Sequence, residues 1–264
     1  MITTYSATPD IDVISSTATI AGFGSLPINA FVLHGPEPLL VETGSVVDAD
    51  GFMAALRTVI DPTELRWIWL SHTDFDHIGS LARLLAENPR LRVITTFFGM
   101  GIMGLSETPL PMDRVHLVNP GQRVTIGQRT LTAFKPPVYD NSVTTAFHDD
   151  ASGALFTADC FGALLTDIPQ SAADLSDGDL RTGQTTWVTI DSPWIYGLDR
   201  DMFAGELDRI RAVEPTVVLS DHLPPAPGTM LGRMLDTLAA APDAAPFMGP
   251  DQLALQQMLE AATA

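Results

Sequence analysis

The stretch of sequence that decides the fold is Ser71-His72-Thr73-Asp74-Phe75-Asp76-His77-Ile78-Gly79-Ser80. It places two imidazoles and two carboxylates close together, directly after the apolar run 66–70, which predicts a buried strand. Divalent metals favour such nitrogen and oxygen donors, and a loop after a strand can aim alternate side chains into one cleft. The plainer interpretation is a polar loop that caps the following helix, with Asp76 or Ser80 near its N-terminus.

Two further metal-capable residues have the same setting. Asp159 follows the predicted strand 154–157, and His222 follows the predicted strand 216–220. In α/β folds, sites tend to lie at the ends of strands along one edge of a sheet. The three segments therefore predict a single metal site, beside which Asp221 could orient a ligand through a hydrogen bond.

The rest of the chain predicts a single α/β domain over residues 1–240. Apolar runs and turn residues predict strands over 28–33, 39–41, 91–95, 114–118, 123–126, 129–134 and 142–147, and helical spacing predicts helices over 48–60, from Leu81, within 206–212 and over 229–240. Residues 97–113 are too rich in glycine to predict a helix, and 166–186 are expected to form a long polar loop. Residues 241–264 are an Ala/Pro linker and an amphipathic helix, which we expect to pack on the domain; the alternative is a homodimer contact.

Composition excludes several classes of protein. The chain has 264 residues with 32 acidic and 14 basic side chains, a formal net charge of −18. This charge argues against binding to nucleic acid and to anionic membrane surfaces. The single cysteine, Cys160, excludes a disulfide within the chain and any multi-cysteine metal site, and we expect it to be a buried thiol. With no apolar run of about 20 residues and no secretion signal, a cytoplasmic protein is expected.

The order His-x-Asp-x-Asp-His, then Asp159, then His222 resembles the metallo-β-lactamase-fold superfamily. Glu42-Thr43-Gly44, after the strand 39–41, is similar to that family's strand ending in an acidic residue, threonine and glycine. The superfamily usually has His-x-His-x-Asp-His. An acidic residue at the second position is similar to the flavodiiron and oxygen-binding diiron branch, where it is glutamate. The resemblance implies a four-layer αββα sandwich with a metal site at one edge.

Carried over residue by residue, the resemblance implies two adjacent divalent metals. One would be held by Asp76, His77 and His222, the other by His72 and Asp74, and Asp159 would bridge them. At the position of a further family histidine this chain has Val138. Tyr139 or Asp140 could be a substitute ligand, as could water. Otherwise the protein holds a single metal and Val138 simply fills space in an apolar core.

The proposed ligands are three imidazoles and three carboxylates. Asp74 makes the metal position that it shares with His72 rich in oxygen. This favours iron or manganese over zinc without excluding zinc. The resemblance favours iron. The resemblance implies binding or reduction of O2 or NO at a di-iron centre. Because only about 40 residues follow His222, with no room for the branch's flavodoxin domain, the electrons are expected from a separate reductase.

Two other functions stay open. One is a metallohydrolase that directs metal-bound hydroxide at an ester, lactone, thioester or phosphoester of a small-molecule substrate, with Asp74 or Asp76 accepting a proton. The other is a binding protein without catalysis, holding one metal or none.

Overall fold

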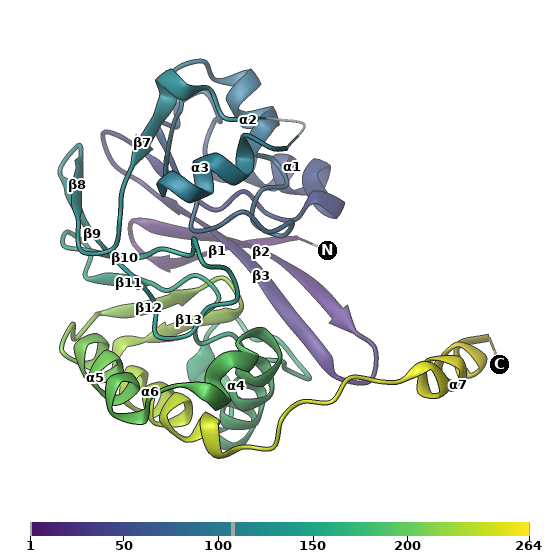
Figure 1. Ribbon diagram of the computed structural model, residues 1–264. Coiled ribbons are helices and arrows are strands. Elements are labelled where there is room, and N and C mark those ends of the chain that lie inside the picture. The colour runs from purple at the N-terminus through teal and green to yellow at the C-terminus, as the bar shows by residue number, and fades with distance from the viewer. Residues whose placement is uncertain (1, 107–108, 264) are drawn as a thin grey trace.

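The central strands are buried on both faces, because helices cover one side of each sheet and the other sheet covers the opposite side (Figure 1). The computed structural model describes residues 2–106 and 109–263. The four-layer αββα sandwich expected from the sequence is confirmed.

The first sheet has seven strands in sequence order: β1 (Thr3–Thr8), β2 (Ile11–Ile20), β3 (Gly24–Leu33), β4 (Leu39–Val41), β5 (Trp67–Trp69), β6 (Arg92–Thr95) and β7 (Val115–Leu117). Strands β1 to β4 pair antiparallel, and β4 to β7 pair parallel. Its outer face carries α1 (Ala49–Val59), α2 (Leu81–Glu87) and α3 (Phe97–Met103).

The second sheet has six strands in the order β13 (Leu223–Pro227), β12 (Val217–Ser220), β11 (Ala154–Phe156), β10 (Ala146–Asp149), β9 (Arg129–Phe134) and β8 (Arg123–Ile126). Only β11 and β12 pair in parallel among these neighbours. Helices α4 (Asp177–Asp191), α5 (Arg200–Arg211) and α6 (Leu231–Ala240) cover its outer face.

Strand β5 shows how the sequence directs side chains into two cores. Successive side chains of a strand point to opposite faces, so Trp67 and Trp69 lie between the sheets while Ile68 packs under the helices. Trp69 meets Phe147 of the second sheet with ring centroids 4.4 Å apart. This apolar contact joins the two sheets directly beneath the loop 71–80.

The parallel pairs bring four connecting segments to one edge of the sandwich. Glu42 follows β4, the loop 71–80 follows β5, Asp159 follows β11 and His222 follows β12. Because the carboxyl ends of parallel strands point the same way, the strand-end residues of each sheet meet there.

The polar loop expected over 166–186 is wrong in its second half, where α4 begins. The Ser176 hydroxyl accepts a hydrogen bond from Asp179 N, which caps the helix. Gly183 lets α4 approach its neighbour, since a Cβ there would lie 2.5 Å from Leu164 O. The two glycines and many polar residues of α4 conceal it from apolar periodicity, although Ser176 is an N-terminal signal.

The last helix, α7 (Gln252–Thr263), approaches the tip of the β2–β3 hairpin, where a Cβ at Gly22 would lie 3.9 Å from Met258 Cε, and its packing on the domain stays a prediction. It lies apart from the four layers (Figure 1), and Leu253, Leu255 and Leu259 are exposed. Phe247 in the linker contacts Phe23 at the tip of the β2–β3 hairpin, with ring centroids 5.3 Å apart. Over the described residues, no helix is both long enough and apolar enough to cross a membrane.

Candidate metal centre

The loop 71–80 is anchored by the segment that follows β4. Thr43 donates to His77 O through both its backbone N (2.8 Å) and its hydroxyl (2.7 Å), and Gly79 N donates to Gly44 O (2.7 Å). A Cβ at Gly79 would lie 2.3 Å from the backbone of Ser45, so only glycine permits this approach. The Glu-Thr-Gly segment therefore fixes where the histidines and aspartates of the loop point.

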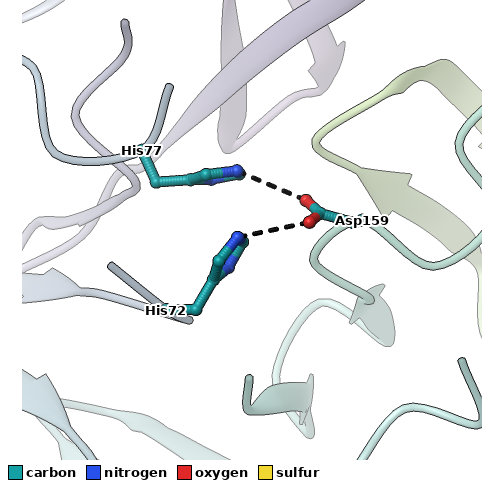
Figure 2. Close-up of side chains that lie close together, drawn as sticks. All are labelled: His72, His77 and Asp159. Atoms are coloured by element: carbon teal, nitrogen blue, oxygen red, sulfur yellow. Dashed lines mark ion pairs between the residues drawn. The ribbon is translucent and has the colours of Figure 1, made fainter. Parts of the chain in front are cut away.

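Asp159 lies in a strained turn at the centre of the site. Its neighbours Ala158 (φ 51°) and Phe161 (φ 70°) both adopt the left-handed region, which is uncommon for residues other than glycine. The turn directs Asp159 at the loop from the first sheet, where His72 and His77 face its carboxylate (Figure 2).

The two oxygens of Asp159 face different histidines. Oδ1 lies 3.3 Å from His77 Nε2 and 3.2 Å from His222 Nε2, whereas Oδ2 lies 3.2 Å from His72 Nε2. A carboxylate in this arrangement can contact two neighbouring cation positions, one on each side.

One of these two cation positions, called the second position from here on, lies among Asp76, His77 and His222. Their donor atoms are within 4.8 Å of one another. His222 Nδ1 lies 2.9 Å from Pro27 O. A carbonyl only accepts, so Nδ1 carries a proton and donates, and in the neutral imidazole Nε2 is the nitrogen with the free lone pair. That lone pair faces Asp76 Oδ2 at 3.4 Å and Asp159.

Two buried carboxylates stand behind His77. Its Nδ1 lies 3.6 Å from Glu42 Oε2 and 3.7 Å from Asp221 Oδ2. Glu42 also accepts a hydrogen bond from Ser71 N at 2.9 Å. Carboxylates in this place orient an imidazole and raise its basicity toward a metal. The sequence suggested this role for Asp221, and the structure adds Glu42.

The other cation position, called the first position from here on, lies among His72, Asp74 and Asp140. Their donor atoms are also within 4.8 Å of one another. His72 Nδ1 is 2.8 Å from the Ser71 hydroxyl, so Nε2 is the nitrogen that faces the cluster. Asn141 donates to Asp74 Oδ1 at 2.8 Å and orients it.

Of the two substitute ligands considered, Asp140 lies in the cluster, whereas the Tyr139 ring is engaged by two other side chains. The Tyr139 ring packs on Trp194 with centroids 5.0 Å apart, and Lys135 Nζ lies 3.7 Å from its centroid. Val138 is 2% exposed and belongs to the apolar core that also contains Cys160.

Sequence reasoning missed one member of the cluster, Asp191. Its carboxylate oxygen lies within 4.8 Å of donor atoms of Asp140 and Asp159. Asp191 is the last residue of α4, the helix that apolar periodicity did not predict. No motif pointed to it, so the sequence offered no signal beyond its being acidic.

The buried polar atoms here fit a cation. The described atoms without a hydrogen-bond partner include His72 Nε2, His77 Nδ1 and Nε2, Asp159 Oδ1, Glu42 Oε2 and Asp221 Oδ2. A buried polar atom without a partner costs about 1–3 kcal/mol. Because His72 Nε2 and His77 Nε2 face Asp159, cations between them would satisfy several of these atoms at once.

The pKa shifts show how strongly these charges interact. Burial by itself lowers the pKa of His222, but the charge and hydrogen bond of Asp159 and the charge of Asp76 raise it to about 9. Burial raises the pKa of Asp159, yet His72, His222 and His77 hold it well below its usual range.

The carboxyls on the far side of Asp159 shift the opposite way. Burial, followed by the charge of Asp159, raises the pKa of Asp140 to about 6. The same two causes, followed by the charge of Asp140, raise the pKa of Asp191 to about 7. These carboxyls repel one another and need positive charge between them.

Cys160, next to Asp159 in sequence, takes no part in the cluster. It is buried, and burial raises the pKa of its thiol far above its usual value. The buried, unreactive thiol expected from the sequence is what the structure has.

A two-sheet sandwich with imidazoles and carboxylates at one edge defines a metallo-β-lactamase-like fold. Residues 27–181, more than half of the chain, match the family described as ODP family beta lactamase, and the chain belongs to that family.

Several flavoproteins are similar to this chain over part of its length. It is 30% identical over 156 residues to the type A flavoprotein fprA of Rhodobacter capsulatus, a match that covers 58% of this chain and 35% of that protein. It is 27% identical over 135 residues to diflavin flavoprotein A 1 of a Synechocystis strain, covering 51% and 23%. The matched part is thus about a quarter to a third of these relatives' length.

Solved structures confirm the fold over almost the whole chain. Rubredoxin oxygen:oxidoreductase from Desulfovibrio gigas has a TM-score of 0.79 at 15% identity, covering 93% of this chain and 63% of that one. The flavodiiron protein from Giardia intestinalis has a TM-score of 0.78 at 14% identity, covering 92% and 60%. The similarity to flavodiiron proteins inferred from the sequence is confirmed.

Proposed function

We propose that this protein binds or reduces O2 or NO at a two-metal centre of the di-iron type. The observation that carries the proposal is the position of Asp159, whose two oxygens face separate groups of imidazoles and carboxylates. Support also comes from the relatives and structural neighbours, which are named as flavoproteins and flavodiiron proteins.

In this proposal six side chains hold the metals: His72, Asp74, Asp76, His77, Asp159 and His222. When bound, a pair of ferrous ions supplies electrons for reduction of O2 or NO. The chain's own residues hold the site in place: Pro27 O fixes the tautomer of His222, and Glu42 and Asp221 face Nδ1 of His77. Trp187 packs edge-on against His222, with ring centroids 5.0 Å apart.

The electrons come, in our proposal, from a separate reductase. Support comes from the relatives, which are named as flavoproteins, because a flavin can carry electrons. Assembly into a homodimer and a cytoplasmic location stay predictions.

The test is elemental analysis of protein expressed with both iron and zinc available, with visible spectra before and after exposure to oxygen. We expect two irons per chain, a spectrum that changes with oxygen, and oxygen consumption when a chemical reductant is present. Two zincs and an unchanged spectrum would instead support the metallohydrolase. A colourless protein with one zinc, or with no metal, would contradict the proposal and favour a non-catalytic role.

Asp159→Ala provides the control for the two-metal assignment. Because Asp159 faces both positions, its loss should abolish metal binding at both. Full stoichiometry in the variant would show that Asp159 does not join the two positions.

A further inference from the structure

The first cation position lacks the histidine that the family pattern has at the place of Val138. Val138 is 2% exposed and packs in the apolar core, so its side chain offers no ligand. The Tyr139 ring packs on Trp194 and faces Lys135. A functional position must therefore be completed by other side chains.

Asp140 lies where such a side chain is needed. Its Oδ1 is 3.9 Å from His72 Nε2, and its side chain is 26% exposed, so cations can reach it from solvent. Asp140 belongs to two groups of candidate ligands, one with His72 and Asp74 and one with Asp159 and Asp191. It therefore joins the two groups into a single cluster of one imidazole and four carboxylates.

A second observation indicates that this cluster binds a ligand. His72 is buried, with its side chain 1% exposed, and its Nε2 faces the cluster with no hydrogen-bond partner. An imidazole nitrogen beside several carboxylates and without a hydrogen-bond partner is suited to bind a cation.

The segment that carries Asp140 is held in place. Lys135 Nζ donates to the backbone carbonyls of Asn141 (3.3 Å), Ser142 (2.8 Å) and Thr144 (3.0 Å). Trp194 Nε1 donates to Tyr139 O at 2.8 Å. Asp140 is thus presented by a fixed turn, as a ligand must be if it is to hold an ion in a defined place.

We propose that Asp140 and Asp191 complete the first cation position, together with His72, Asp74 and Asp159. The position then has one nitrogen donor among oxygens and suits an oxygen-seeking divalent cation such as Mn²⁺ or Fe²⁺. The second position, with two imidazole donors from His77 and His222, prefers Zn²⁺ over Mn²⁺ more strongly than the first position does. This inference rests on the proposed two-metal site and adds that its two positions are unlike.

Ligand chemistry sets the expected difference. Zn²⁺ generally binds a site more tightly than Mn²⁺, but imidazole donors widen that preference and carboxylates narrow it. Zn²⁺ should therefore displace Mn²⁺ from the second position at a lower concentration than from the first.

The test is equilibrium dialysis of the metal-free full chain with Mn²⁺, followed by titration with Zn²⁺. Elemental analysis counts both metals, and electron paramagnetic resonance counts the Mn²⁺ released. For the unmodified chain we expect two bound Mn²⁺, of which one requires at least about 10-fold more Zn²⁺ for displacement.

Asp140→Asn and Asp191→Asn remove one negative charge each with little change in shape. We expect each substitution to lower the affinity for the Mn²⁺ that is displaced last by at least about 10-fold. A loss of this size is typical when metal ligands or the residues that support them are altered. The other Mn²⁺ should be retained. Tyr139→Phe is the matched control, because it removes the neighbouring candidate oxygen, and it should behave as the unmodified chain.

Two results would overturn the proposal. One is displacement of both Mn²⁺ ions from the unmodified chain in a single step, a result that depends on no variant. The other is binding of the late-displaced ion as tightly in either asparagine variant as in the unmodified chain. Neither result involves turnover, so a failure of oxygen reduction by the iron-loaded protein remains a separate finding.

Discussion

Replacing Asp159 by asparagine should remove most of the pH dependence of stability that the metal-free protein shows in mildly alkaline solution. In the folded chain, burial lowers the pKa of His222, but the neighbouring Asp159 and Asp76 carboxylates raise it from 6.5 to about 9. Both carboxylates oppose the effect of burial. Asp159, which lies 3.2 Å from His222 Nε2, raises the pKa of His222 more than Asp76 does. The amide keeps the shape of the side chain and removes its charge.

The magnitude follows from linkage between protonation and folding. A histidine whose pKa is higher in the folded state stabilises the fold fully below its unfolded pKa, and this stabilisation is lost as pH rises through its folded pKa. The pKa of His222 rises from 6.5 to about 9 on folding. At 1.36 kcal/mol for each pKa unit, this residue alone contributes about 3 kcal/mol to the free energy of unfolding. The pKa of His77 is also raised, which gives a change of the same sign.

The assay is urea unfolding of the metal-free protein, with a chelator present, at several pH values between 6 and 10. The fall in the free energy of unfolding across this range should be about 3 kcal/mol larger in the unmodified chain than in Asp159→Asn, because groups distant from Asp159, such as Lys135, titrate in both. Asp150→Asn is a matched control, because it removes the carboxylate 3.3 Å from Nδ1 of the more exposed His148. Exposed pairs contribute about 0–1 kcal/mol. Equal slopes for Asp159→Asn and the unmodified chain would refute the reasoning.

Three further predictions follow from the same coordinates. A metal that binds at Nε2 of His222 must expel its proton at pH 7.5, so metal titration with a pH indicator should show proton release that declines above pH 9, the region of its pKa; no release would contradict it. Gly79→Ala should destabilise the fold by about 2 kcal/mol or more through overpacking, and it should weaken metal binding. Gly205→Ala, in open space on α5, should instead stabilise the fold by about 0.5–1 kcal/mol. Urea midpoints measure both changes, and equal effects would contradict the packing argument. Ser176→Ala should cost about 1 kcal/mol through loss of the N-cap of α4, measured by thermal unfolding; an unchanged melting temperature would contradict it.

The sequence predicted the parts of this molecule that depend on local pattern. Strands 123–126 and 129–134 coincide with β8 and β9, because their alternating burial leaves a pattern of period two. The rule that sites lie at strand ends predicts that the loop 71–80, Asp159 and His222 meet, and the structure places them within hydrogen-bonding distance or slightly beyond.

The parts that the sequence could not predict depend on packing between distant segments. Strand β13 contains three prolines, which argue against a strand, but it is an edge strand, where prolines are tolerated. Helix α4 owes its position to burial of Leu180 and Val188 and to the close approach at Gly183, none of which creates an apolar stripe. With α4 unpredicted, Asp191 had no assigned place in the fold.

The choice between Tyr139 and Asp140 shows why a ligand set cannot be read from neighbours in sequence alone. Both residues follow Val138, and both carry an oxygen. Trp194 and Lys135 engage the Tyr139 ring, whereas the Asp140 carboxylate lies 3.9 Å from His72 Nε2. The first sheet supplies His72 and Asp74, and the second sheet with its helix supplies the facing carboxylates. A cation held there would join the two halves of the sandwich, so that its binding and the folding of the whole chain would be linked.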